Sequence, residues 1–167
     1  MRLIKRQQGS TLIELLLAVT VASIVITLAT PSFNDLVERK RLKLAAETVV
    51  ADFNFFRQEG LKRRVPDFSF NVIDGSNWCY GISVGSCTCT TANSCSVRQV
   101  AGTEFAGLAS LSSSVAKYTY DPVRGVVTAG NITLSTSGGF NLRVVISALG
   151  RTSICSPSAN VPEYLAC

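Results

Sequence analysis

Histidine is absent from this 167-residue chain, which excludes imidazole-based catalysis, as in a Ser-His-Asp triad, and imidazole–metal chemistry. Charged residues are also scarce, at 16% against 47% hydrophobic residues, and this apolar balance excludes a disordered chain. The acidic residues of the C-terminal part show no spacing typical of paired carboxylate catalysis: Asp67, Asp74, Glu104, Asp121 and Glu163. The sequence therefore predicts a protein that is not an enzyme and that needs no cofactor and no metal.

The positive charge is small once its position is considered. The chain carries a net +5, but Arg2, Lys5 and Arg6 supply three of these charges. Without residues 1–9, the net side-chain charge is +2. A pI near 9.0 therefore does not by itself predict a nucleic-acid-binding protein, because the rest of the chain is close to neutral.

The C-x-x-C spacing of common zinc sites is missing, and the closest cysteines form only Cys87-Thr-Cys89. All six cysteines follow an apolar N-terminal segment, which favours disulfides in the bacterial periplasm or at the cell surface. The spacing predicts a bond between Cys155 and Cys167 that ties down the C-terminal tail. Four cysteines then remain, and the sequence leaves their pairing open among three possibilities: Cys79, Cys87, Cys89 and Cys95.

A short basic segment, residues 1–9, precedes an apolar run, residues 10–30, whose only charge is Glu14. The run is long enough to span a bilayer as a helix, and the positive residues before it predict a cytoplasmic N-terminus. A secretory signal peptide would end at a small-residue cleavage site, but Pro31 stands where that cleavage would fall. A plain membrane anchor would leave Glu14 unexplained, because a carboxylate in lipid is costly without a partner.

The residues Gly9-Ser-Thr-Leu-Ile-Glu14 resemble the type IV prepilin signature, a glycine followed by an apolar run with glutamate at its fifth position. The resemblance implies that a prepilin peptidase cleaves between Gly9 and Ser10 and that the new amine of Ser10 is methylated, although the family usually has phenylalanine there. It also implies that Glu14 pairs with the N-terminal amine of a neighbouring subunit. Such a pair offsets the cost of placing each charge in an apolar environment.

Beyond Pro31, apolar residues at spacings of three and four predict an amphipathic helix that packs on a sheet: Leu42, Ala46, Val49, Phe53 and Phe56. After Pro66, alternation of period two predicts antiparallel strands around a cysteine-rich loop at 85–96. The strand candidates are 68–72, 78–84, 118–120, 125–128, 132–135 and 140–149. The predicted fold class is α+β. Residues 10–30 form the transmembrane half of a long helix, residues 31–65 its amphipathic half, and residues 66–167 an antiparallel β domain.

Three further segments resemble the GspH/FimT/FimU group of minor pilins and pseudopilins. They are Arg57-Gln-Glu-Gly-Leu-Lys-Arg63 at the helix end, Asn77-Trp-Cys-Tyr-Gly81, and Gly150-Arg151. The resemblance implies a structural and assembly subunit of a type IV pilus or of a type II secretion pseudopilus. Such a subunit is a single-pass protein of the bacterial inner membrane with a periplasmic C-terminal domain, and it later joins the fibre. Its partners would be other pilins or pseudopilins, the prepilin peptidase and inner-membrane lipid.

DNA binding during natural transformation is the alternative role, because FimT-like proteins carry a C-terminal Gly-Arg-x-Arg motif. The matching residues here read Gly150-Arg-Thr-Ser153, so a serine replaces the second arginine. Arg143 and Arg151, together with Arg124, would form the basic face that contacts DNA phosphates. The favoured interpretation is that these are solvated arginines at strand ends, because scattered arginines on a near-neutral domain rarely form a phosphate track.

Overall fold

A computed structural model describes residues 11–167, apart from the side chains of residues 28–32. The chain divides into two compact units, Met1–Leu36 and Val37–Cys167. The predicted leader, residues 1–9, and the predicted cleavage and methylation site at Gly9 and Ser10 lie outside the described residues. Within the described part of the chain, no helix combines the length and the apolar character that crossing a membrane requires.

Helix α1, Leu12–Arg63, continues through Pro31 and ends close to the predicted boundary. Arg64 follows with a φ of 50°, in the left-handed conformation that commonly ends helices, and Pro66 prevents further extension. Lys62 and Arg63 occupy the last turn, where cations interact favourably with the helix dipole. The predicted apolar stripe is completely buried: Leu42, Ala46, Val49, Phe53 and Phe56.

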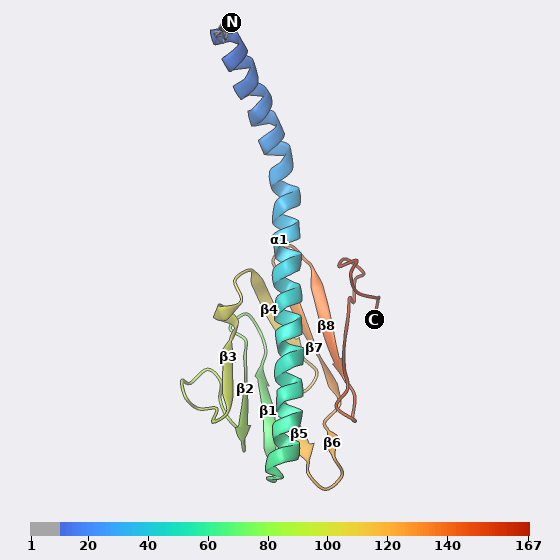
Figure 1. The fold of residues 1–167 in the computed structure, drawn as a ribbon. Helices are drawn as coiled ribbons and strands as arrows, with labels where there is room; N and C mark the ends of the chain where they lie inside the picture. The colour runs from blue at the N-terminus through green and yellow to red at the C-terminus, as the bar shows by residue number, and fades with distance from the viewer. Residues whose placement is uncertain (1–10) are drawn as a thin grey trace, which may run out of the picture. The chain divides into compact units, whose positions relative to one another are not determined.

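Two antiparallel sheets form the rest of the second unit, and the C-terminal half of α1 lies against them (Figure 1). The first has the order β3-β2-β1-β5-β6. Its strands are β1 Phe68–Ile73, β2 Cys79–Val84, β3 Arg98–Ala101, β5 Lys117–Asp121 and β6 Val126–Val127. The second has the order β4-β7-β8-β9. Its strands are β4 Leu108–Ser113, β7 Gly130–Thr136, β8 Asn141–Ile146 and β9 Thr152–Cys155, and a short 3-10 helix η1, Gly102–Glu104, precedes β4. The predicted α+β class is confirmed.

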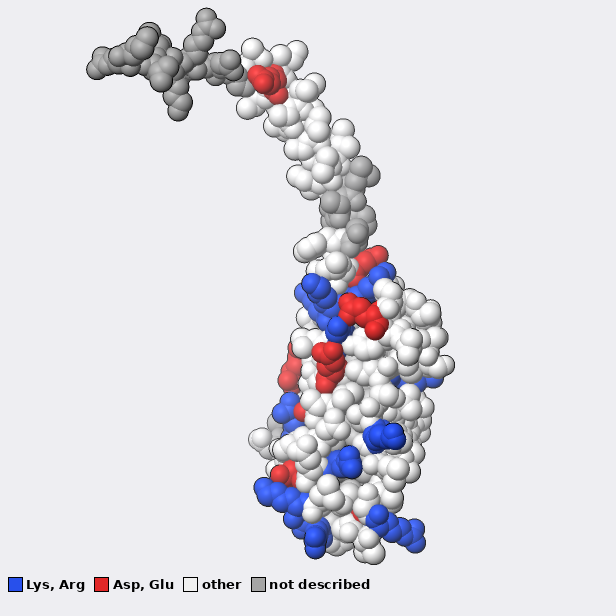
Figure 2. Space-filling model, turned by 45° about the vertical axis from the view of Figure 1, so that its right-hand side comes forward, with Lys and Arg blue, Asp and Glu red and all other residues white. Residues whose placement is uncertain are grey.

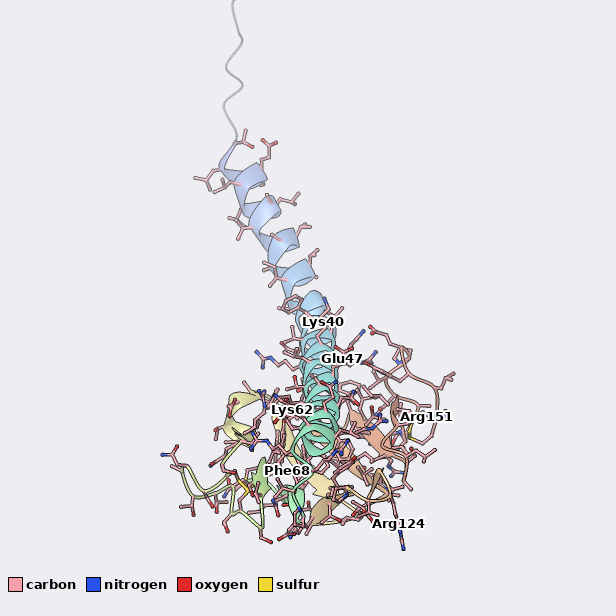
Figure 3. All side chains as sticks on the ribbon, turned by 60° about the horizontal axis from the view of Figure 1, so that its bottom comes forward. Lys40, Glu47, Lys62, Phe68, Arg124 and Arg151 are labelled. Atoms are coloured by element: carbon pink, nitrogen blue, oxygen red, sulfur yellow. A yellow bond between two sulfur atoms is a disulfide. The ribbon has the colours of Figure 1, made fainter. Side chains whose placement is uncertain are left out.

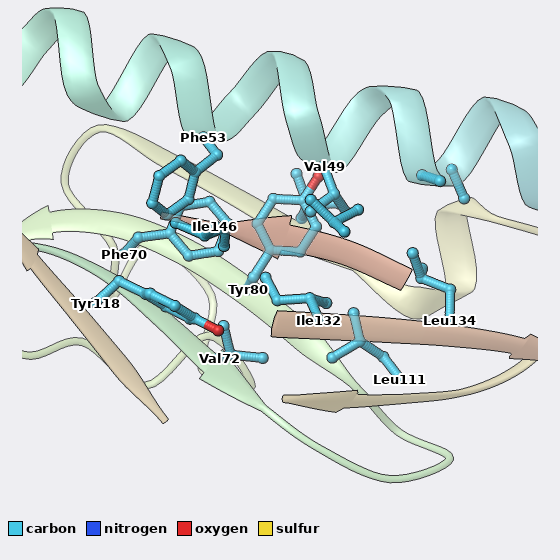
Figure 4. Packing of buried hydrophobic residues seen from close by; sticks show 14 of the residues in the cluster. Val49, Phe53, Phe70, Val72, Tyr80, Leu111, Tyr118, Ile132, Leu134 and Ile146 are labelled. Carbon is cyan, nitrogen blue, oxygen red and sulfur yellow. The ribbon is translucent and has the colours of Figure 1, made fainter. Parts of the chain in front are cut away.

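The hydrophobic core lies between α1 and the two sheets (Figure 4). Phe53 of α1 contacts the rings of Phe70 and Tyr118, with centroids 5.5 Å and 5.6 Å away. Ile132 and Leu134 of β7 fill the side formed by the second sheet and are 1% and 0% exposed. One continuous core therefore joins the helix to both sheets. The opposite face of this part of the helix is not covered by the sheets.

The strand predictions were correct for the aromatic strands, but they missed three strands and made a fourth too long. The short strands β3, β4 and β9 were missed, since β4 is rich in serine and β3 and β9 contain only four residues each. The predicted strand at 140–149 is too long, because β8 ends at Ile146 and a turn follows. Gly150 in that turn has a φ of +72°, a conformation that favours glycine.

Candidate assembly segment and basic surface

The first part of α1 carries its apolar side chains on the surface. Every residue from 11 to 27 is exposed, and Leu12, Ile13 and Leu17 are 81%, 76% and 65% accessible. Glu14 lies in the first turn, where the helix dipole favours a carboxylate. A helix that is apolar around its whole circumference is stable only when lipid or other helices surround it. This part of α1 is therefore a candidate segment for insertion or assembly.

The hydroxyl groups of this segment bond to the backbone of the same helix. Thr20 Oγ1 donates to the carbonyl of Leu17 at 2.8 Å. The hydroxyls of Ser23 and Thr27 each donate to the carbonyl three residues earlier, also at 2.8 Å. Satisfied donors lower the cost of moving a helix into apolar surroundings. The polar residues of the segment are thus compatible with a lipid or helix-bundle environment.

The six cysteines form three disulfides, and the pairing that the sequence left open is Cys79 with Cys89 and Cys87 with Cys95. These two bonds fasten the loop after β2 onto the outer side of the first sheet, where they form a small second core with Ile73. The third bond joins Cys155 to Cys167. No cysteine in the described chain is free, so the cysteines serve to fasten loops.

The residues of the segment Asn77-Trp-Cys-Tyr-Gly81 are closely packed against the neighbouring backbone and the second disulfide. Trp78 is buried, and a Cβ on Gly102 would stand 2.7 Å from its indole. Gly81 lies beneath the second disulfide, because a Cβ there would stand 2.2 Å from Cys95 Sγ. This family-like segment therefore has a packing role.

The C-terminal loop is held against α1 by side chains as well as by its disulfide. Lys43 forms an ion pair with Glu163, and the hydroxyl of Tyr164 donates to Glu47 Oε1 at 3.3 Å. Lys43 lowers the pKa of Glu163 through a hydrogen bond and its charge, and Glu163 raises the pKa of Lys43 in the same way. Both groups are solvent-exposed, so the pair orders the loop more than it stabilises the fold.

The structure places the three arginines of the predicted basic face in different surroundings. Arg143 of β8 donates from Nε to Thr133 Oγ1 at 3.2 Å, and Arg124 lies 4.0 Å from Asp121 in the exposed β5–β6 turn. Arg151 is exposed in the turn between β8 and β9. In Figure 3, Lys62 and Arg151 lie on opposite sides of α1. The three do not form one cluster.

Register shows how Arg143 and Arg151 are related. The backbone carbonyl of Arg151 accepts a hydrogen bond from the N–H of Ser147, so these two residues lie opposite each other on neighbouring strands. Ser147 is four residues after Arg143 along the same strand direction, so Arg143 and Arg151 lie on the same face of the second sheet. Four strand residues span about 13 Å. The two arginines therefore face the same way but are too far apart to hold one phosphate together.

Sequence reasoning gave Arg57 no role in the fold, but the structure places its side chain against Gly150. The side chain of Arg57 extends from α1 across Gly150: a Cβ on that glycine would stand 2.7 Å from Arg57 Cδ and 3.0 Å from its Nε. Arg57 and Gly150-Arg151 belong to two of the segments that carried the family resemblance. Their contact shows that these distant segments meet in space.

A long N-terminal helix packed on two antiparallel sheets is a pilin-like arrangement. Residues 45–150, more than half of the chain, match the family model described as Type II transport protein GspH, and the chain belongs to this family. Residues 4–30 match the prokaryotic N-terminal methylation motif. Neither the curated proteins nor the solved structures contain a match to the chain. The family is structural rather than catalytic.

Proposed function

We propose that this protein is a minor pilin or pseudopilin that a prepilin peptidase processes and that then assembles into a type IV pilus or a type II secretion pseudopilus. The observation that carries the proposal is the exposed apolar surface of α1 between residues 12 and 27, with Glu14 in its first turn. Full burial of each Leu, Ile or Val side chain is favourable by about 1.5–3 kcal/mol of free energy. The gain over this segment favours an inner-membrane anchor before assembly and a helical fibre core after it.

The processing step follows from the match to the methylation motif over residues 4–30. Cleavage between Gly9 and Ser10 creates a positive amine four residues before Glu14. In the fibre, this amine pairs with the Glu14 carboxylate of a neighbouring subunit, since each charge needs an opposite partner in apolar surroundings. The pair sets the axial register between subunits, and the domain after residue 36 faces outward. In this role the protein is not an enzyme.

The test is replacement of Glu14 by Ala in the full chain expressed with its fibre machinery. We expect normal membrane insertion, cleavage to a mature N-terminus at Ser10 by mass spectrometry, and loss of the subunit from sheared fibres. The matched control is Asp35→Ala, which removes an exposed carboxylate from the same helix. Fibres that contain the Glu14→Ala subunit at the normal level would contradict the register role.

DNA uptake is the second candidate function, and one observation favours it. The four strands of the second sheet contain no aspartate or glutamate, so no carboxylate of these strands opposes an approaching phosphate backbone near Arg143 and Arg151. Figure 2 shows Lys and Arg side chains spread over the lower half of one face of the domain. Salt-sensitive DNA binding that Arg151→Gln weakens would support this role, and no binding at low salt would exclude it.

A further inference from the structure

A hollow of about 200 Å³ lies on the domain surface where α1 faces the segment between η1 and β4. Its lining residues come from the helix and from this segment: Arg41, Leu44, Glu104, Phe105 and Ala106. Phe105 is fixed in position because its ring stacks on the buried Trp78, with centroids 5.8 Å apart. The side chain of Arg41 extends over Gly107, where a Cβ would stand 3.3 Å from its Nη1. The hollow is therefore a built feature of this surface.

The hollow has room for one aliphatic side chain. An apolar cavity of about 150 Å³ accepts a benzene molecule, which is larger than the side chain of leucine. Leu44 is 61% exposed at the hollow. An apolar side chain that entered the hollow would cover Leu44 and Phe105 and would also remove its own surface from water.

The C-terminal loop presents a side chain of this kind. Leu165 is 86% exposed, although its backbone is held in place. Its carbonyl accepts the N–H of Ser156 at 2.8 Å, and the disulfide between Cys155 and Cys167 closes the loop around it. A side chain on a loop that is already ordered loses little conformational freedom on binding.

The loop and the hollow lie on opposite sides of α1, at about the same level of the helix. Lys43 and Glu47 contact the loop. Arg41 and Leu44 line the hollow. In Figure 1, β3 and β4 lie on one side of α1 and the C-terminus on the other. Leu165 therefore cannot reach the hollow of its own chain, but it can reach that of a neighbour.

We propose that Leu165 of one subunit inserts into the hollow of a second copy of this chain. A projecting side chain on one side and a hollow on the other form a heterologous contact, which generates an open helical assembly when it is repeated. The contact rests on the proposed function, because it joins the outer domains of neighbouring subunits in a fibre. It is separate from the contacts of the exposed apolar part of α1.

The charges of the two surfaces are complementary. Glu163 is the only charged residue of the loop from 156 to 167, and Lys43 contacts only its Oε2. In the hollow, Glu104 accepts the backbone N–H of Ala101 at 3.0 Å. Arg41 has no ion pair among the described residues. A loop that inserts Leu165 thus brings a carboxylate toward an arginine of the second copy, which favours this partner.

Paired cysteines test the contact in the full chain expressed with its fibre machinery. Leu165→Cys and Ala106→Cys in one chain should form disulfides between copies. These appear as dimers and higher multimers in sheared fibres, and mass spectrometry locates the bond and confirms that the three native disulfides are intact. The matched control is Leu149→Cys with Ala106→Cys, because Leu149 is another exposed leucine, and this variant should remain monomeric.

Single substitutions test the energetic role of the same contact. Leu165→Asp should lower the amount of the subunit in sheared fibres roughly tenfold, the effect of losing one buried leucine. Leu149→Asp should leave this amount unchanged. Ala106→Trp fills the hollow and should act like Leu165→Asp, with a circular dichroism spectrum that matches the wild type.

Two kinds of failure are distinguishable. Double-cysteine subunits that enter fibres at the wild-type level but do not cross-link to each other, or that cross-link to a different subunit, would overturn this contact and leave the proposed function standing. Absence of the wild-type chain from fibres would overturn the proposed function and, with it, this contact.

Discussion

The carboxylate of Asp52 on α1 accepts a hydrogen bond from the buried hydroxyl of Tyr80 on β2, at 2.8 Å. The same oxygen, Oδ2, accepts from Nε of Arg98 on β3, also at 2.8 Å. Burial and the nearby Asp52 charge both raise the pKa of Tyr80, so its hydroxyl stays a donor at any physiological pH. This group of three residues ties the helix to two strands of the first sheet, from the buried Tyr80 hydroxyl to the exposed Arg98.

Replacement of Asp52 by Ala should therefore destabilise the domain. The substitution leaves the Tyr80 hydroxyl buried without an acceptor, which costs about 1–3 kcal/mol. The free energy of unfolding in urea measures the loss. Asp35→Ala is the control and should change stability little, since that carboxylate is exposed. A smaller loss for Tyr80→Phe than for Asp52→Ala is also expected, because the phenylalanine leaves no unsatisfied donor. Equal stability of Asp52→Ala and the wild type would show that the buried bond contributes nothing.

Removal of the C-terminal disulfide by Cys155→Ser with Cys167→Ser should loosen the tail. A bond that closes a loop of this length stabilises a protein by about 3 kcal/mol, mainly through the unfolded state. We expect faster amide exchange at Ser156, whose N–H donates to the carbonyl of Leu165 in the closed loop. Amides of β1 should keep their protection. Uniform loss of protection throughout the domain would show instead that the tail is part of the global folding unit.

Gly81→Ala should interfere with the disulfide between Cys87 and Cys95. The added methyl group would stand 2.2 Å from Cys95 Sγ and 2.9 Å from its Cβ, so the loop must move away from β2. Overpacking of this kind costs about 1–3 kcal/mol. Thiol titration of the folded protein should detect free cysteines, which the wild type lacks. An unchanged thiol count together with unchanged stability would contradict the packing role of this glycine.

The attachment of the C-terminal loop to α1 should depend on pH at both extremes. Lys43 lowers the pKa of Glu163 below its usual value of 4.5. The stabilisation of the loop by this carboxylate is therefore fully present above pH 4.5 and is lost as the pH falls through the lower pKa of the folded state. Glu163 raises the pKa of Lys43 above its usual value of 10.5. The stabilisation of the loop by this ammonium group is therefore fully present below pH 10.5 and is lost as the pH rises through the higher pKa of the folded state. NMR signals of Tyr164, whose ring lies 5.8 Å from Lys43 Nζ, should report both transitions. Glu163→Gln should abolish the acid transition, and its persistence would assign it to another group.

Periodicity alone was sufficient for the helix and for the aromatic strands. The spacing of Leu42, Val49 and Phe53 identifies the buried face of α1, and alternation around Phe70 identifies β1, because the side-chain period of each element is local. The three missed strands have too few apolar residues for a local signal. They form because neighbouring strands offer unpaired backbone groups, as β2 does for β3 and β8 for β9.

The sequence by itself determined the apolar N-terminal segment that contains Glu14, the α+β class, and the presence of disulfides, since each depends on residue type and short spacing. Only the tertiary structure decided the pairing of Cys79 with Cys89 and the placement of Arg57 against Gly150. Both depend on how strands pair and where the helix lies on them. Contacts between residues far apart in the chain depend on the shared core, and no local pattern encodes them.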